Sequence, residues 1–236
     1  MTTPRFTLRA DVNGTWTGVE RIRLDAGEVD GAIDAVRAFM RTTGTTIASW
    51  WLSELSTPSD VEERLLASGL RRIESDYLLD GLLLTRAPPP AQPGVKARPV
   101  ASAAEFVAAT EAQYEAFATP AEQRRDADAL TEQYELHRTS DVDVHYAAWV
   151  DGRLAGCARA MFSSRGVFMA GGSTLPWARG RGAYRALVRA RWDDAAARGT
   201  PALAVSAGSM SAPILLRLGF ESVCRFRRIE DVLSSS

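Results

Sequence analysis

The sequence predicts an α/β fold built on a mixed sheet, with an additional α/β subdomain at its N-terminal end. Two observations carry this expectation. After residue 95, strand-like and helix-like segments follow one another, and a glycine-rich turn joins one strand directly to a helix. The 236 residues allow one large domain or two small ones, and a hydrophobic share of 46% is ample for a buried core.

A proline-rich segment, residues 87–94 (Ala-Pro-Pro-Pro-Ala-Gln-Pro-Gly), marks the expected domain boundary. Its four prolines exclude a helix or a central strand and favour an extended, semi-rigid connector. We therefore expect an N-terminal subdomain at 1–86, a linker at 87–94 and a main domain at 95–236.

The main domain begins with a predicted strand at 95–100 and two helices. The first helix, 102–117, has Ser102 as its N-cap and Glu105 three residues on, the pattern of a capping box. The second helix is expected at 120–137, because Pro120 suits the first turn of a helix.

A three-strand antiparallel meander is expected next, at 144–150, 154–162 and 167–175, with turns at Asp151-Gly152 and Arg165-Gly166. The remaining elements are a helix at 183–198, a strand at 202–205, a short helix at 213–218 and a last strand at 223–229. Strands 167–175 and 202–205 should be parallel neighbours joined by a crossover helix, which leaves a crevice at the carboxyl end of the first.

The turn behind strand 167–175 has the composition of an anion site. Gly180 and Gly182 allow successive backbone N–H groups to point toward one place, and the helix start adds a partial positive charge. Arg179, Arg181 and Arg185 supply further positive charge. The alternative is an exposed, arginine-rich turn that only caps a helix; the order strand, glycine loop, helix favours a phosphate or pyrophosphate cradle.

Charge and composition argue against several other classes of partner. The net charge of −1 provides no basic field, so we expect no nucleic-acid partner. Cys157 and Cys224 lie far apart without CxxC spacing, so no metal site is expected. Residues 1–10 lack the apolar centre of a signal peptide, and no run suits a membrane span. We expect a cytoplasmic protein without a membrane partner.

From about residue 95 to 233 the chain resembles the GCN5-related N-acetyltransferase superfamily. Arg179-Gly-Arg-Gly182 matches the family's Arg/Gln-x-x-Gly-x-Gly/Ala pyrophosphate motif at its first four positions. Pro176 lies where the family commonly has proline, and Ala212 with Leu218-Gly-Phe220 matches its closing pattern.

This resemblance implies acetyl-CoA as the acyl donor and an amine of a small molecule or peptide as the acceptor, with direct attack in a ternary complex. The loop would bind the pyrophosphate and the preceding strand end would pair with the pantetheine arm. A homodimer is compatible with it. The implied donor-binding residues are Ser173, Thr174, Leu175, Arg179, Gly180, Arg181, Gly182, Ala183, Tyr184 and Ser209.

The sequence departs from the family pattern at three places. The last position of the loop motif is Tyr184, and its spacing to Leu187 and Val188 favours a side chain that points toward the core. The position of the usual general-acid tyrosine is Leu215, and strand 167–175 has no glutamate base. His145 fits a structural role better than that of a base, so we assign no catalytic residue. A non-catalytic acyl-CoA-binding sensor is therefore the alternative function.

The N-terminal subdomain partly repeats the order of the C-terminal elements, and we call this partial repeat the echo. A helix at 29–40, a strand at 47–52, a helix at 61–66 and a strand at 77–85 repeat the later order, and Leu65 and Gly69 coincide with Leu215 and Gly219 after a shift of 150 residues. Because no Arg-x-x-Gly-x-Gly precedes the echo, this part is expected to be a degenerate acetyltransferase-like half that does not bind acetyl-CoA and instead packs or shapes the substrate site.

Overall fold

The computed structural model describes residues 3–10, 16–73 and 78–233, and it consists of two compact units. Unit 1 comprises residues 1–81, 206–212 and 222–236, and unit 2 comprises residues 82–205 and 213–221. Strand β5 (Leu78–Leu84) runs across the division at Gly81.

Unit 2 is built on a mixed sheet, which confirms the predicted fold class. Its strands lie in the order β10-β9-β8-β7-β6, all antiparallel except the parallel pair β9 and β10. The crossover between β9 and β10 is helix α5, as the sequence predicts. The strands are β6 (Val95–Pro99), β7 (Asp143–Val150), β8 (Arg153–Ser163), β9 (Gly166–Thr174) and β10 (Leu203–Ala207).

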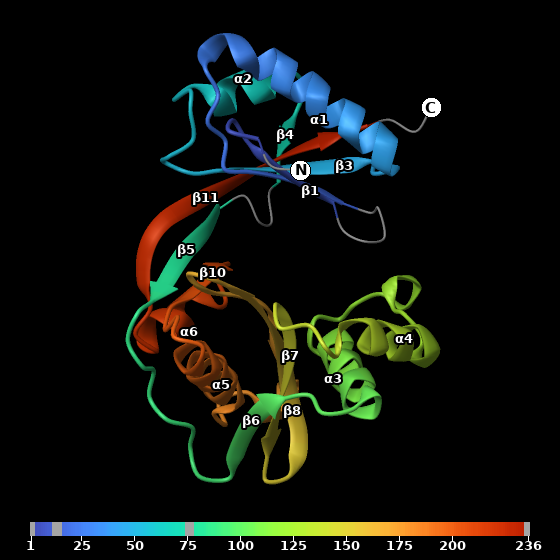
Figure 1. Cartoon of the computed structure of the whole chain (residues 1–236), viewed down its shortest axis with the longest axis vertical. Coiled ribbons are helices and arrows are strands. Elements are labelled where there is room, and N and C mark those ends of the chain that lie inside the picture. Colours follow the sequence, from blue (N-terminus) through green and yellow to red (C-terminus); the bar gives the residue numbers. More distant parts are fainter. Residues whose placement is uncertain (1–2, 11–15, 74–77, 234–236) are drawn as a thin grey trace. The chain divides into compact units, whose positions relative to one another are not determined.

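Helices cover both faces of this sheet (Figure 1). α5 (Ala183–Ala197) lies on one face, and α3 (Ala103–Ala116) with α4 (Ala127–His137) lies on the other. Adjacent residues of β7 show the two sides: the Tyr146 hydroxyl donates to Asp194 of α5 at 2.5 Å, while the His145 ring contacts Phe106 of α3 edge to face. The short helices are η2 (Ala121–Gln123), η3 (Pro176–Ala178) and α6 (Ala212–Arg217).

The expected helix from 120 to 137 is wrong at its beginning. Residues 121–123 form only the 3₁₀ turn η2, after which Arg124 returns to extended backbone (ψ 136°). The Asp126 side chain then accepts a hydrogen bond from the N–H of Ala129 at 2.8 Å and starts α4. An aspartate N-cap is a stronger helix start than a proline six residues earlier.

The strands of unit 1 lie in the order β1-β2-β3-β11, with β4 paired to β11. β2 and β3 are parallel and are joined by α1, so they form a β-α-β crossover. The core lies between this sheet and the helices and includes Val36, Trp50 and Ile229, each fully buried. The elements are β1 (Thr7–Ala10), β2 (Thr17–Glu20), η1 (Ala26–Glu28), α1 (Val29–Thr43), β3 (Ile47–Leu52), α2 (Val61–Ala67), β4 (Arg71–Arg72) and β11 (Glu221–Val232).

The units divide the chain differently from the boundary expected at 87–94. That segment lies inside unit 2, where the carbonyl oxygen of Pro88 accepts a hydrogen bond from Arg189 of α5 at 3.0 Å. The last strand, expected in the main domain, belongs almost wholly to unit 1, where β11 pairs with β3 from Arg227↔Leu52 to Val232↔Ile47. Unit 1 is therefore completed by a strand from the end of the sequence.

The echo noted in the sequence has a structural counterpart in how α2 and α6 end. Gly69 (φ 89°) and Gly219 (φ 97°) both adopt the left-handed conformation. In each case the next residue donates a backbone hydrogen bond to the equivalent leucine, Leu70 to Leu65 at 3.1 Å and Phe220 to Leu215 at 3.2 Å. The two helices thus end in the same αL capping geometry. The strand expected at 77–85 is β5, and Tyr77 lies outside the described residues.

Candidate functional site

Strand β9 contains a bulge close to its carboxyl end. On β8, Cys157 pairs with Ser173 and Arg159 pairs with Ala170, so two residues of β9, Gly171 and Gly172, oppose a single residue of β8. Gly171 is left-handed (φ 57°), a conformation that glycine adopts without strain. Such bulges turn backbone groups out of the ladder and are frequent beside active sites.

The pairing of β9 with β10 ends just before this bulge. Only Val167 and Phe168 pair with Leu203 and Ala204, although β9 continues to Thr174. Along the rest of β9, the edge that turned toward β10 has no ladder partner among the described residues. An open edge of this kind can accept an extended, amide-bearing chain as a further strand.

Helix α5 begins behind β9 and η3 without any side-chain cap. Its N-cap is Gly182 (φ 87°), which accepts the first helical hydrogen bond from Ala186 at 3.0 Å but caps nothing itself. Gly180 (φ 75°) is also left-handed, and no atom lies within 4 Å of the position that its Cβ would occupy. The N–H groups of the first helical turn are therefore available to an anion.

The three arginines of the loop have different environments. Arg181 forms an ion pair with Asp151 at 2.8 Å and lies 5.5 Å from the centre of the Trp177 ring, so it is directed toward the β7–β8 turn. Within the described part of the chain, Arg179 and Arg185 have no acidic partner. These two are the cations that a bound phosphate could recruit without breaking an existing pair.

Tyr184 points toward the sheet, as its spacing to Leu187 and Val188 predicts. Its ring edge lies 2.9 Å from the position that a Cβ atom on Gly172 would occupy, and its hydroxyl oxygen lies 3.6 Å from the same position. Burial raises the pKa of the Tyr184 phenol, and the charge of Arg191 lowers it. The absence of a side chain at Gly172 leaves the room that this ring occupies.

The expected pantetheine strand carries a polar atom that suits a ligand. Ser173 and Leu175 are buried, and the Ser173 hydroxyl lies 3.4 Å from the Cys157 sulfur. Thr174 Oγ1 and Trp177 Nε1 are buried and have no hydrogen-bond partner in the described residues. Buried polar atoms without partners are rare in native proteins and call for a ligand or water. Together with the uncapped helix, they fit an acyl-CoA chain and its pyrophosphate.

Two glutamines that the sequence analysis did not single out also contact this site. Gln92, from the proline-rich segment, places Oε1 2.6 Å from the Cβ position of Gly182. Gln113 of α3 donates to the carbonyl oxygen of Gly171 at 2.8 Å. Neither lies in a motif, so no local signal could have identified them.

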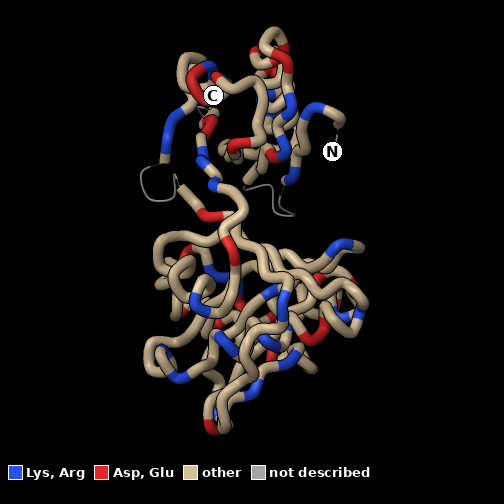
Figure 2. Tube along the Cα trace, turned by 90° about the vertical axis from the view of Figure 1, so that its left-hand side faces the viewer, with Lys and Arg blue, Asp and Glu red and all other residues tan. Residues whose placement is uncertain are grey.

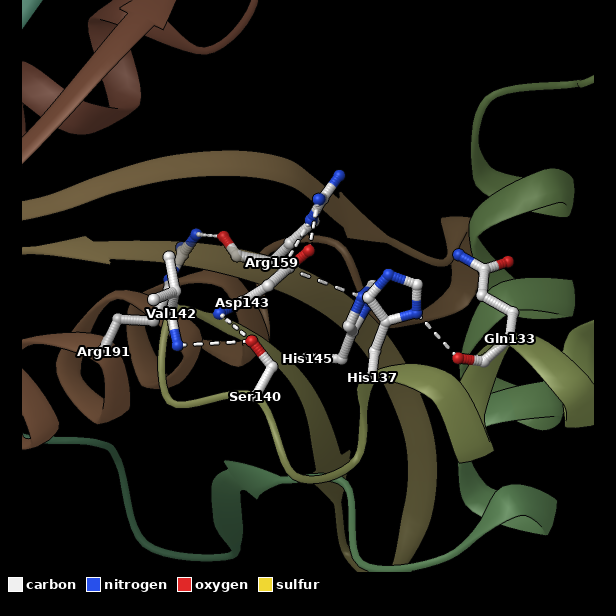
Figure 3. A network of polar contacts seen from close by, with 8 residues as sticks. All are labelled: Gln133, His137, Ser140, Val142, Asp143, His145, Arg159 and Arg191. Carbon is white, nitrogen blue, oxygen red and sulfur yellow. Dashed lines mark hydrogen bonds and ion pairs between the residues drawn. The ribbon is translucent and has the colours of Figure 1, made fainter. Parts of the chain in front are cut away.

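The opposite, α3-facing side of the sheet holds a polar network (Figure 3). Asp143 binds Arg159 through both of its carboxylate oxygens and lies 4.0 Å from Nε2 of His145. His137, at the end of α4, contacts the carbonyl oxygen of Gln133 through Nδ1 at 2.8 Å and lies beside His145 in Figure 3. Burial, above all, lowers the pKa of His145 to about 4, which makes this imidazole neutral and weakly basic.

Two further residues named in the sequence analysis come from other segments of the chain. Leu215 is fully buried in α6 (0% exposed) and has no proton to donate. Ser209 belongs to unit 1, whereas the other nine predicted donor-binding residues belong to unit 2. Those nine form two runs, 173–175 at the end of β9 and 179–184 in the loop and the start of α5, with η3 between them.

The part of the chain that the structure describes holds neither a metal cluster nor a membrane-spanning helix. No group of three or more His, Cys, Asp or Glu side chains there could hold a metal ion. None of the helices in these ranges has the length and apolar character needed to cross a bilayer. Figure 2 shows acidic and basic residues interspersed along the trace.

Solved structures share this fold. The chain is similar to a GCN5-related N-acetyltransferase from Kribbella flavida, with a TM-score of 0.69, 20% identity, and coverage of 92% of this chain and 80% of that one. A GCN5-related N-acetyltransferase from Sphaerobacter thermophilus gives a TM-score of 0.70 and 15% identity over 98% of this chain and 77% of that one.

A tandem GNAT protein from the clavulanic acid biosynthesis pathway gives a TM-score of 0.65 and 15% identity, with coverage of 98% of this chain and 79% of that one. No protein-family model and no curated protein matches the sequence. The chain therefore has the fold of the GCN5-related N-acetyltransferases.

Proposed function

We propose that the chain transfers an acetyl group from acetyl-CoA to an amine of a small molecule or peptide, with the donor bound in unit 2. The observation that carries this proposal is the uncapped N-terminus of α5, which follows directly on the bulged and open end of β9. Solved structures with a similar fold include proteins named as N-acetyltransferases, which supports the proposal.

The donor would be held by backbone groups along one continuous stretch. The N–H groups at Ala183 and Tyr184, with the side chains of Arg179 and Arg185, would bind the pyrophosphate, because helix starts attract anions. Ser173, Thr174 and Leu175 would pair with the pantetheine arm, and Thr174 Oγ1 would gain the hydrogen-bond partner that it lacks.

The reaction needs positioning more than it needs reactive side chains. A neutral amine nitrogen attacks the thioester carbon, the C–N bond forms, the C–S bond breaks, the amine loses one proton to solvent and the sulfur gains one. Holding both reactants together supplies much of the rate. Backbone N–H groups freed by the bulge at Gly171 and Gly172 would stabilise the oxyanion that develops on the carbonyl oxygen.

Calorimetry with acetyl-CoA tests the donor site. We expect the Arg179→Ala variant to bind acetyl-CoA roughly tenfold more weakly, the loss of one charge-assisted hydrogen bond. Arg165→Ala is the matched control, since Arg165 is an exposed arginine in the β8–β9 turn. If the natural sequence does not bind acetyl-CoA, or if the two variants weaken binding equally, the assignment of the loop is wrong.

A non-catalytic acyl-CoA sensor is the second candidate, and the buried Leu215 favours it. The two functions separate when free thiol is followed during incubation with acetyl-CoA and a panel of primary amines. Thiol release that depends on an amine supports the transferase. Binding without release on every amine supports the sensor.

Unit 1 is proposed to be a degenerate half that does not bind acetyl-CoA. Its crossover helix follows η1, where Asp25 and Glu28 form a capping box, with the Asp25 N–H donating to the Glu28 carboxylate at 2.8 Å. Acidic side chains thus occupy the helix start that glycines leave open in unit 2, and they would repel a phosphate. The tandem GNAT neighbour supports the two-half arrangement.

A further inference from the structure

We propose that Tyr184 donates the proton that the departing CoA sulfur takes up, a role that rests on the proposed acetyl transfer. No other part of the proposed mechanism supplies this proton, and Leu215 cannot.

The Tyr184 hydroxyl lies where the thioester is expected. Its oxygen is 3.6 Å from the Cβ position of Gly172, one of the two residues in the bulge. If the pantetheine arm pairs with Ser173–Leu175 in β9, the sulfur comes next along the strand, at the level of Gly171 and Gly172. The phenol and the reacting sulfur then share one stretch of β9.

The proton of Tyr184 is not engaged elsewhere. The hydroxyl of Tyr146 donates to Asp194 at 2.5 Å, and that of Tyr114 accepts from the N–H of Arg125 at 3.2 Å. For Tyr184, the described residues provide no hydrogen-bond partner. A general acid must keep its proton free for the substrate, and the Tyr184 phenol, unlike that of Tyr146, does so.

The buried guanidinium of Arg191 can stabilise the phenolate that forms when Tyr184 donates its proton. Arg191 lies two helical turns after Tyr184 on the same face of α5 and is 1% exposed. Its Nε donates to the carbonyl oxygen of Leu187 at 3.0 Å, its Nη1 to that of Arg159 at 3.3 Å, and its Nη2 has no partner in the described residues.

Among the residues that the structure describes, the Arg191 guanidinium thus has no carboxylate partner, and its charge favours the anionic form of Tyr184. Burial has the larger, opposite effect and raises the pKa of the phenol, so the group is protonated and able to donate at neutral pH.

Every proton and electron pair in the proposed step is accounted for. As the C–N bond forms and the C–S bond breaks, the electron pair of the C–S bond stays on sulfur. The Tyr184 O–H bond breaks and an S–H bond forms, which releases CoA as the free thiol. The phenolate beside Arg191 then regains a proton from solvent, which carries the one that the amine lost.

The Tyr184→Phe variant tests the proposal by two measurements. The first is the ultraviolet titration of the thiol in bound CoA, with desulfo-CoA as the blank. Loss of the phenol should raise the pKa of the bound thiol by roughly one unit, because a charged sulfur loses a hydrogen-bond donor. The second is amine-dependent thiol release, which should fall about a hundredfold in kcat with the affinity for acetyl-CoA unchanged.

Tyr114→Phe is the matched control: its hydroxyl accepts a hydrogen bond from the N–H of Arg125, and its loss should change neither measurement. If the Tyr184→Phe variant binds CoA and both measurements match the natural sequence, Tyr184 is not the donor although acetyl transfer stands. Loss of CoA binding in this variant assigns Tyr184 to binding and also overturns the proposal. If the natural sequence does not bind CoA, the proposed function fails, and this inference fails with it.

Discussion

The side-chain amide of Gln113 donates a hydrogen bond to the backbone carbonyl oxygen of Gly171 at 2.8 Å and thereby ties helix α3 to the bulge of β9. The left-handed backbone of Gly171 (φ 57°) is held from the α3 side by this bond, while Arg191 holds the carbonyl oxygen of Arg159 on the neighbouring strand from the α5 side. The bulge is therefore fixed from both faces of the sheet.

Replacing Gln113 by leucine should loosen the bulge without touching the phosphate loop. We expect about 1 kcal/mol less stability, the net value of one hydrogen bond. We also expect a several-fold lower kcat for amine acetylation with unchanged affinity for acetyl-CoA, measured by thiol release and calorimetry. Gln123→Leu, in the exposed turn η2, is the control. An equal loss in affinity and kcat would contradict the assigned role.

Adding a methyl group at Gly172 should push the Tyr184 ring away from β9. The new Cβ would lie 2.9 Å from the ring edge, closer than carbon atoms pack. We expect Gly172→Ala to lower the free energy of unfolding, measured in urea, by roughly 1 to 3 kcal/mol. The same substitution should cost much less stability in a chain that also carries Tyr184→Ala.

Gly31→Ala provides the contrast for this substitution. Gly31 lies in α1 with no atom within 4 Å of its Cβ position, so alanine should stabilise the helix by about 0.5 to 1 kcal/mol. If the stability losses of Gly172→Ala and Tyr184→Ala add up in the double variant, the Tyr184 ring does not lie against Gly172.

His145 should make stability depend on pH between about 4 and 6.5. Burial lowers its pKa from 6.5 to about 4; Asp143 acts in the opposite direction, and Arg159 and His137 add to the lowering. The unfolded chain therefore binds more protons in this window, so stability falls as the pH decreases from 6.5 toward 4, on the order of 2 kcal/mol.

Thermal unfolding at a series of pH values checks this dependence. His145→Gln should flatten the slope between pH 6.5 and 4.5, whereas His137→Gln should keep most of it. Equal slopes for the natural sequence and His145→Gln would rule out His145 as the source.

The ion pair between Arg37 and Asp231 should contribute to the stability of unit 1. Arg37 of α1 donates through Nε at 2.7 Å and Nη2 at 3.0 Å to the two oxygens of Asp231 in β11, whose side chain is 5% exposed. Asp231→Asn should cost about 2 kcal/mol, less than the ~3–5 kcal/mol of a fully buried pair because Arg37 reaches water.

The exposed pair of Arg64 and Asp60 serves as the reference for this measurement. Asp60→Asn should change the free energy of unfolding by less than about 0.5 kcal/mol. Chemical unfolding measures both variants, and a loss as small at Asp231 as at Asp60 would contradict a structural role for the buried carboxylate.

Much of unit 2 could be predicted because its signals are local. The turn at Asp151-Gly152, the helix stop at Gly199 and the glycine loop before α5 each lie within a few residues of the element that they define. By contrast, β1 and β2 in unit 1 have only four residues each and no alternation long enough to recognise, so the sequence analysis missed them.

The rest depends on contacts between distant residues. The pairing of β11 with β3 joins residues near opposite ends of the sequence, and no local pattern specifies it. In the site, the glycine loop was recognisable, but Gln113 and Arg191 take part only because α3 and α5 bring them to the β9 bulge and its neighbouring strand. Nothing in the sequence around such side chains distinguishes them from other polar residues.

The pairing of β11 with β3 has a consequence for the order in which the polypeptide folds during its synthesis. Residues 1–81 leave the ribosome first, yet the strand that covers the edge of their sheet is translated only after nearly all of unit 2. Until then, the newly made β3 has an open edge, which is the kind of surface that chaperones bind and that promotes aggregation. The half that is translated first is thus the half that finishes folding last.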